Sequence, residues 1–260
     1  MQNITNREPK SQTLSKAIQI LENFTPENPE WGIRDLGRDL GFTPTSIYRL
    51  VSTLHAAGYL EQNPDTRRYT LGPQIIKLAS IYTHVNPIPG VALKIFEKYE
   101  DKFEYNFYLG RLRNFELIYL SVLDGRGPIK IVVDPGGSTS LYSTALGKVF
   151  LAFQDDSYFE EYIMKVPLTA FTERTILDVD QLRAHLQKIR FQGFAVNNGE
   201  HYDTIGAVGV PIMNKSKQVL LGVSLAYPRA LDHGESFNLE NIIDIAKEIA
   251  DEISSRIQLQ

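Results

Sequence analysis

The chain has 260 residues, a formal net charge of −4, 43% hydrophobic residues and no cysteine. The absence of cysteine excludes disulfides, thiolate metal ligands and a cysteine nucleophile. No apolar run reaches the roughly 18 residues of a membrane span, and the polar residues 1–10 lack the apolar stretch of a secretory signal, so we expect a cytoplasmic protein without membrane association.

The charge is divided unevenly along the chain. Residues 1–80 hold nine Lys and Arg and eight Asp and Glu, a net charge of +1, which leaves −5 for the remainder. Between Thr43 and Leu60 there is no acidic residue, and Arg49 is the one Lys or Arg. The overall acidity therefore does not exclude a nucleic-acid partner, because the acidic excess belongs to the C-terminal part.

Three short helices and a hairpin are predicted in the first 72 residues. Apolar residues at helical spacing predict helices over 13–24, 33–40 and 44–57. Gly41 ends the second helix, and Thr43-Pro44 begins the third. Strand-like residues 59–62 and 68–71 flank the turn-forming Asn63-Pro64-Asp65-Thr66. This order of elements describes a winged helix-turn-helix.

The remaining residues predict a linker and a second domain. Gly72-Pro73 opens a helix over 74–83, and Asn86-Pro87-Ile88-Pro89-Gly90 interrupts it. We therefore predict a DNA-binding domain over 1–72, a linker helix over 73–87 and an effector-binding domain over 88–260. In the last of these we expect strands at 105–112, 116–123, 129–133, 208–213 and 219–227, and helices at 145–153, 157–165, 180–190 and 238–257. The mixture predicts the α+β class, with a largely antiparallel sheet covered by helices.

The third predicted helix offers a polar face to DNA. If Ile47, Leu50, Val51 and Leu54 point inward, the 3.6-residue period turns hydroxyls and Arg49 outward. Arg49 suits a bidentate guanine contact, and Arg67 and Arg68 beside the hairpin turn would touch the DNA backbone or minor groove. Such a face alone is more often merely solvated, so the ordered combination of elements carries the prediction. The predicted DNA-binding residues are Thr43, Thr45, Ser46, Tyr48, Arg49, Ser52, Arg67 and Arg68.

Several segments together resemble one family. The stretch from Ile33 to Phe42, with Ser46-Ile47-Tyr48-Arg49-Leu50, resembles the DNA-binding half of IclR-type transcriptional regulators, and Gly58-Tyr59-Leu60 and Tyr69-Thr70-Leu71-Gly72 match its wing. The C-terminal part matches the family in the same order at Ser143-Thr144-Ala145-Leu146-Gly147-Lys148, Phe171-Thr172-Glu173-Arg174-Thr175-Ile176, Gly193-Phe194-Ala195-Val196 and Glu200-His201. The resemblance covers about Ser11 to Ile257.

The resemblance implies a winged helix-turn-helix, a linker helix and a GAF-like α/β effector-binding domain. It implies a homodimer or tetramer that binds palindromic double-stranded operator DNA, more often as a repressor, under the control of a small organic acid, an aromatic compound or a sugar-derived acid. The candidate effector-binding residues are Leu141, Thr144, Ala145, Leu146, Asn197, Ala207 and Ser224.

Each of these positions has a second possible role or a departure from the family. Ser143 or Thr144 could cap the following helix, and Phe107, Tyr108, Leu141 and Tyr142 could be either cavity walls or ordinary core. Ala207 stands where the family usually has Cys, Thr204 replaces a common Gly, and Ala226 replaces a frequent Ser. These replacements favour a larger or more neutral ligand.

The sequence leaves two other classes of protein to compare with this interpretation. An enzyme is disfavoured because no Gly-x-Ser-x-Gly or Walker A pattern is present, and His84, His185, His201 and His233 lack metal-ligand spacing. His201, with Ser143 or Thr144, is the best catalytic candidate, and an enzyme-like domain acting on a small organic acid would need it. We expect no catalytic residue, metal or cofactor. A DNA-binding regulator without a ligand stays an alternative.

Overall fold

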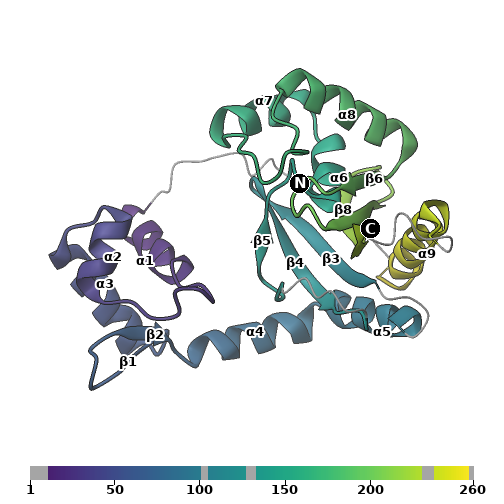
Figure 1. Ribbon diagram of the computed structural model, residues 1–260. Helices are drawn as coiled ribbons and strands as arrows, with labels where there is room; N and C mark the ends of the chain where they lie inside the picture. The colour runs from purple at the N-terminus through teal and green to yellow at the C-terminus, as the bar shows by residue number, and fades with distance from the viewer. Residues whose placement is uncertain (1–10, 101–104, 127–132, 230–236, 258–260) are drawn as a thin grey trace. The chain divides into compact units, whose positions relative to one another are not determined.

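The computed structural model describes residues 11–100, 105–126, 133–229 and 237–257 (Figure 1). The chain divides into two compact units, residues 1–86 and 87–260. None of the described helices combines the length and apolar character that crossing a membrane requires.

The first unit is a three-helix bundle with a hairpin and a further helix. Its elements are α1 (Gln12–Glu22), α2 (Ile33–Leu40), α3 (Pro44–Ala56), β1 (Leu60–Gln62), β2 (Tyr69–Leu71) and α4 (Gln74–Val85). Gly41 ends α2 in the left-handed conformation at φ 67°, and the Thr43 hydroxyl accepts from Ser46 N–H at the start of α3. The core consists of Ile20, Leu36, Ile47, Val51, Leu60 and Tyr69. The predicted winged helix-turn-helix is confirmed.

The second unit is built on an antiparallel sheet. In the described residues its strand order is β5-β4-β3-β8-β7-β6. The strands are β3 (Asn106–Arg113), β4 (Glu116–Leu123), β5 (Ser138–Thr139), β6 (Ala195–Asn198), β7 (Ile205–Met213) and β8 (Val219–Pro228). The helices are α5 (Ile88–Glu100), α6 (Ala145–Ala152), α7 (Asp156–Lys165), α8 (Val179–Gln192) and α9 (Leu239–Ile257). The predicted α+β class is confirmed.

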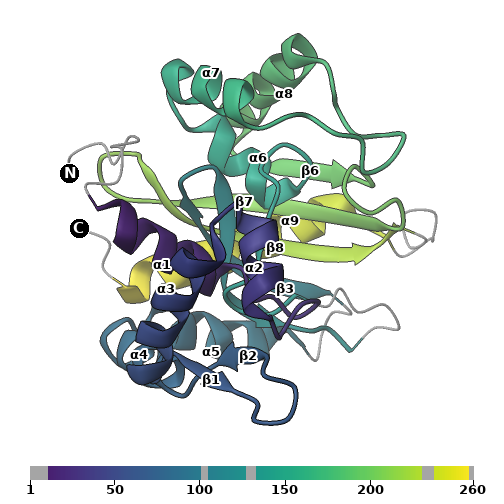
Figure 2. The ribbon, with the colours of Figure 1, turned by 90° about the vertical axis from the view of Figure 1, so that its left-hand side faces the viewer.

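The two faces of this sheet carry different helices (Figure 2). Because side chains alternate along a strand, Phe107 and Leu109 point to the face covered by α5 and α9, where the larger core lies. Tyr108 and Ser224 point to the other face, which α6 covers and behind which α7 and α8 pack.

Close approach of α6 to the sheet depends on glycine. A Cβ atom at Gly209 would lie 2.8 Å from the Ala145 carbonyl carbon. Gly209 is registered with Ser224, and Ser224 with Tyr108, across β7, β8 and β3. The start of α6 therefore lies directly over this part of the sheet.

The structure differs from the predicted elements in a few places. The prediction missed α5, β5 and β6. The residues around Pro89 look like a break, but α5 begins at Ile88, so Pro89 falls in the first turn, where its missing N–H has no helical partner to lose. Most of the predicted strand 129–133 lies outside the described residues, which omit 127–132.

Candidate functional site

A cavity of about 140 Å³ lies between the start of α6 and the sheet. Six of the seven predicted effector residues gather at it, although they come from four separate stretches of the chain. The lining residues are Tyr108, Tyr119, Val133, Ser138, Thr139, Thr144, Ala145, Leu146, Asn197, His201, Tyr202, Ile205, Ala207, Ser224 and Ala226.

Leu141 does not line this cavity, contrary to its assignment as an effector-binding residue. It is wholly buried in the core under α6. Its backbone lies so close to Gly147 that a Cβ there would be 2.5 Å from the Leu141 Cα. Leu141 therefore shapes the turn that leads into α6.

Thr144 caps α6, as the alternative reading proposed. Its hydroxyl accepts from Gly147 N–H at 3.1 Å and donates to the Ser140 carbonyl at 2.8 Å. The first N–H groups of a helix have no partner within the helix. In the part of the chain that the structure describes, the N–H groups of Ala145 and Leu146 have no other partner either. The cavity is therefore lined by two N–H donors without a partner and by the positive end of a helix dipole.

Asn197 holds the turn after β6. Its side-chain N–H donates to the Ser143 carbonyl, and its oxygen accepts from Gly199 and Glu200 N–H at 3.0 and 3.1 Å. Because both lone pairs of the oxygen and one N–H are occupied, Asn197 positions the cavity wall and has one N–H left for a ligand.

His201 is part of the cavity wall, a role that sequence reasoning missed. Its Nδ1 lies 2.8 Å from Ser143 Oγ, and its ring is flanked by Phe171 and Tyr202 at centroid distances of 4.3 and 4.6 Å. Burial lowers the pKa of His201. Ser143 is wholly buried and does not line the cavity, so this pair cannot present a serine nucleophile to a bound molecule.

Tyr108 is buried at the cavity with its hydroxyl unpaired among the described residues. Burial, followed by the neighbouring Tyr119, raises its pKa well above the ordinary value. The sequence suggested only an apolar wall here, because alternation along a strand does not show where a hydroxyl will end.

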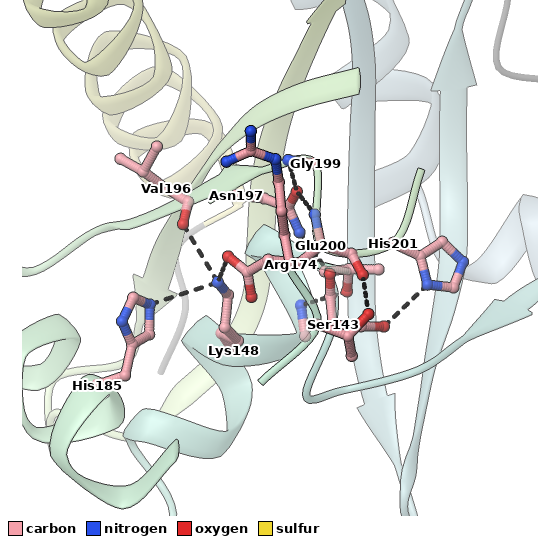
Figure 3. Close-up of polar contacts among 12 residues, drawn as sticks. Ser143, Lys148, Arg174, His185, Val196, Asn197, Gly199, Glu200 and His201 are labelled. Atoms are coloured by element: carbon pink, nitrogen blue, oxygen red, sulfur yellow. Dashed lines mark hydrogen bonds and ion pairs between the residues drawn. The ribbon is translucent and has the colours of Figure 1, made fainter. Parts of the chain in front are cut away.

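A buried ion pair lies behind the cavity (Figure 3). Lys148 on α6 is wholly buried and pairs with Glu200, and its Nζ also lies 3.2 Å from the Val196 carbonyl and 3.3 Å from His185 Nε2. Burial lowers the pKa of Lys148, against the attraction of Glu200. It also lowers the pKa of His185 to about 4, with Lys148 as the next cause. The described residues contain no group of three or more metal-ligating side chains.

The predicted DNA-facing residues of α3 are solvent-accessible. Tyr48 is 59% exposed, Thr43, Thr45 and Arg49 are exposed, and Ser46 and Ser52 are half-buried. A shallow groove joins this face to the start of α1 and adds Lys16, a cation that the sequence pattern did not place there. The groove is lined by Gln12, Thr13, Lys16, Thr43, Thr45, Ser46, Arg49, Leu50 and Thr53.

The two arginines of the wing differ. Arg67 is exposed and has a left-handed φ of 60°. Arg68 folds back onto the first unit, with its guanidinium 3.0 Å from the Glu30 carboxylate and 3.6 Å from that of Asp35. Arg67 is therefore free to meet DNA, whereas Arg68 is engaged within the protein.

Comparisons with known proteins are consistent along the chain. Residues 13–64 match the IclR helix-turn-helix domain, and residues 81–255 match the bacterial transcriptional regulator IclR C-terminal family. The transcriptional regulator KdgR of Escherichia coli is 27% identical over 82% of this chain and 81% of its own, and XynR of the same organism is 25% identical over 84% and 86%.

Solved structures show the same fold. An IclR transcriptional regulator from Silicibacter sp. TM1040 aligns with a TM-score of 0.84 and 29% identity over 94% of this chain and 96% of its own. An IclR homologue from Microbacterium hydrocarbonoxydans, solved in complex with 4-hydroxybenzoate, aligns with a TM-score of 0.80 and 21% identity over 95% of this chain and 100% of its own.

Proposed function

Because this chain belongs to the IclR family of DNA-binding transcriptional regulators, we propose that a small molecule bound in the cavity at α6 controls its binding to operator DNA. One observation carries the proposal: residues from four distant stretches converge on a cavity in the unit that does not hold the reading helix. The protein would work in the cytoplasm, as a repressor rather than as an activator.

DNA recognition is proposed for the exposed face of α3. Arg49 would read a guanine edge, and the Thr45 and Ser46 hydroxyls near the helix start would bind phosphate oxygens. Arg67 would contact the DNA backbone from the wing.

A homodimer is supported by α4. This helix has no buried residue, although Leu78, Ile81, Tyr82 and Val85 follow one another at the spacing of a single helical face. All four are at least 44% exposed. Pairing with a second copy, in a dimer or a tetramer, would cover this apolar stripe, and two α3 helices would then read a palindrome.

Control would follow from linkage. The ligand favours the arrangement of the dimer in which it binds more tightly, and half-sites about one helical turn apart can be read together in only one arrangement. The same coupling free energy must appear as an effect of DNA on ligand affinity.

The reading role is tested with Arg49→Ala, measured by operator binding against mismatched operators. We expect a loss of roughly 1–3 kcal/mol and relaxed preference at one base pair. Arg113→Ala, at an exposed position on β3, is the control. Retained affinity and selectivity in Arg49→Ala would remove Arg49 from the reading role.

The effector role is tested with Ser224→Leu, which fills the cavity from its floor. We expect operator affinity to persist while the response to ligand disappears. Loss of both would assign Ser224 to packing, and an operator affinity that no ligand changes would favour the regulator without a ligand.

A further inference from the structure

We propose that the cavity selects a ligand of about one six-membered ring that carries at most one negative charge and presents an oxygen acceptor to Tyr108 and the start of α6. This inference rests on the proposed effector role of the cavity and names the class of compound that fills it.

The size of the ligand follows from the cavity volume. At about 140 Å³, the cavity is close to the roughly 150 Å³ of an apolar cavity that holds benzene. A ligand with one ring suits the cavity walls. These walls include the aromatic ring of Tyr119 and the apolar side chains of Val133, Leu146, Ile205, Ala207 and Ala226.

The charge of the ligand is limited by the walls. The lining residues that the structure describes include no Lys, Arg, Asp or Glu. Helix α6 carries one cationic side chain, Lys148, which is buried. Lys148 does not line the cavity and forms an ion pair with Glu200. Because its pKa is lowered by burial, His201 is neutral at pH 7.

One carboxylate can still be accommodated. A helix start carries about half a positive charge, and Ala145 and Leu146 offer two free N–H groups. A second negative charge would be buried without a cationic partner among the described lining residues, which is costly. We therefore expect dicarboxylates and phosphate monoesters to bind more weakly than monocarboxylates and neutral compounds.

The need for an oxygen acceptor comes from Tyr108. Its side chain is 4% exposed, and its hydroxyl has no partner in the described part of the molecule. The raised pKa keeps this hydroxyl protonated, so it is a donor. A buried donor without a partner destabilises the protein, and a ligand oxygen would satisfy it.

Calorimetric titration of the full chain at pH 8 tests the proposal with three probes of similar size. Benzamide is neutral, benzoate carries one charge, and phenyl phosphate carries two at this pH. We expect benzoate and benzamide to bind at least tenfold more tightly than phenyl phosphate. Tyr108→Phe should weaken benzoate binding roughly tenfold. Tyr162→Phe removes another buried hydroxyl without a partner among the described residues, at a position that does not line the cavity, and should change the affinity by no more than about twofold.

Each contrary outcome has one meaning. Tighter binding of phenyl phosphate, or equal losses of benzoate affinity in Tyr108→Phe and Tyr162→Phe, overturns the selectivity. If a dianion binds, is lost in Ser224→Leu and changes operator affinity, the selectivity is wrong but the proposed function stands. If no probe binds, the ring-sized class is wrong. The effector role fails as well only if a wider set of sugar acids and larger neutral compounds also leaves operator affinity unchanged.

Discussion

Two neighbouring arginines in the wing have different surroundings. Arg68 ties the hairpin to Glu30, which precedes α2, and to Asp35 in the first turn of α2, and its side chain is 38% exposed. Arg67 extends from the turn into solvent. In the sequence, Arg67 and Arg68 look equally available to DNA. The acids that pair with Arg68, Glu30 and Asp35, lie more than 30 residues earlier in the chain.

We predict that Arg67→Ala weakens DNA binding evenly across sequences and lowers the salt slope by about one. Arg68→Ala should instead leave the slope almost unchanged and reduce the stability of the first unit by up to about 1 kcal/mol, the range of exposed ion pairs. Operator titrations at several salt concentrations and urea unfolding separate the two effects. A flattened slope in Arg68→Ala alone would reverse the assignment.

His185 gives the protein a pH dependence. In the folded state its pKa is about 4 rather than 6.5, first because of burial and then because Lys148 faces its Nε2. The unfolded chain therefore takes up a proton on this residue between about pH 6.5 and 4, and the folded protein does not. Stability must fall as the pH is lowered through this interval.

We predict that the urea midpoint decreases from pH 6.5 to 4 and that His185→Gln reduces this decrease. His201 contributes in the same direction, because its pKa is also lowered by burial, so the decrease should not vanish. His84→Gln, on α4, is the matched control. An identical pH profile for His185→Gln and the unmodified protein would contradict the assignment.

The candidate site could be predicted only in part at this scale. The motif at Ser143–Lys148 led to the start of α6, and Thr144, Ala145 and Leu146 do lie at the cavity. The Lys148–Glu200 pair could not be predicted, because a lysine followed by an apolar run looks like an exposed residue at a helix start. Asn197 looked like a ligand contact, yet its amide mainly holds backbone groups.

At the scale of elements, the contact between α6 and β7 leaves no room for a side chain at Gly209. The atoms that a Cβ at Gly209 would meet are the carbonyl carbon and oxygen of Ala145, at 2.8 and 2.9 Å. These are backbone atoms, so they cannot turn aside as a side chain would, and α6 would have to move as a whole.

We predict that Gly209→Ala costs about 1–3 kcal/mol of unfolding free energy, the usual range for overpacking, and weakens ligand binding because the start of α6 is displaced. Thermal unfolding and calorimetric titration measure the two effects. Gly90→Ala is the control, because a Cβ there meets nothing within 4 Å. Unchanged ligand affinity in Gly209→Ala would show that the cavity tolerates a displaced helix.

Elements with strong periodicity or clear ends were predictable. Gly41 indicated the end of α2, and Thr43-Pro44 indicated the start of α3. The strand predicted over 116–123 has the same bounds as β4. The short β6 was missed because four residues carry too little alternation. Proline and glycine near Ile88 concealed α5, whose helical face becomes clear only against the core that covers it.

At the scale of the whole molecule, the hydrophobic clusters divide cleanly. One of the clusters found in the described residues belongs entirely to residues 1–86. The others lie within residues 87–260. Each unit thus has its own core, and the order of the two units along the chain was predictable from the resemblance.

We predict that a fragment of residues 87–260 folds with a cooperative thermal transition and keeps the ligand affinity of the full chain, while losing operator binding. Differential scanning calorimetry and ligand titration of the fragment provide the check, with the full chain as reference. A fragment that folds but loses its ligand affinity would show that residues 1–86 contribute to the cavity.

The cavity wall has its own small cluster, Tyr108, Ile205 and Ala226, apart from the two larger cores of its unit. Exchanges at these positions alter the chemistry of the hollow while most of the apolar surface that drives folding stays in place. Under the proposed effector role, a change of ligand would therefore need only a few successive mutations, each leaving a folded protein on which selection can act. The architecture separates the evolution of recognition from the maintenance of the fold.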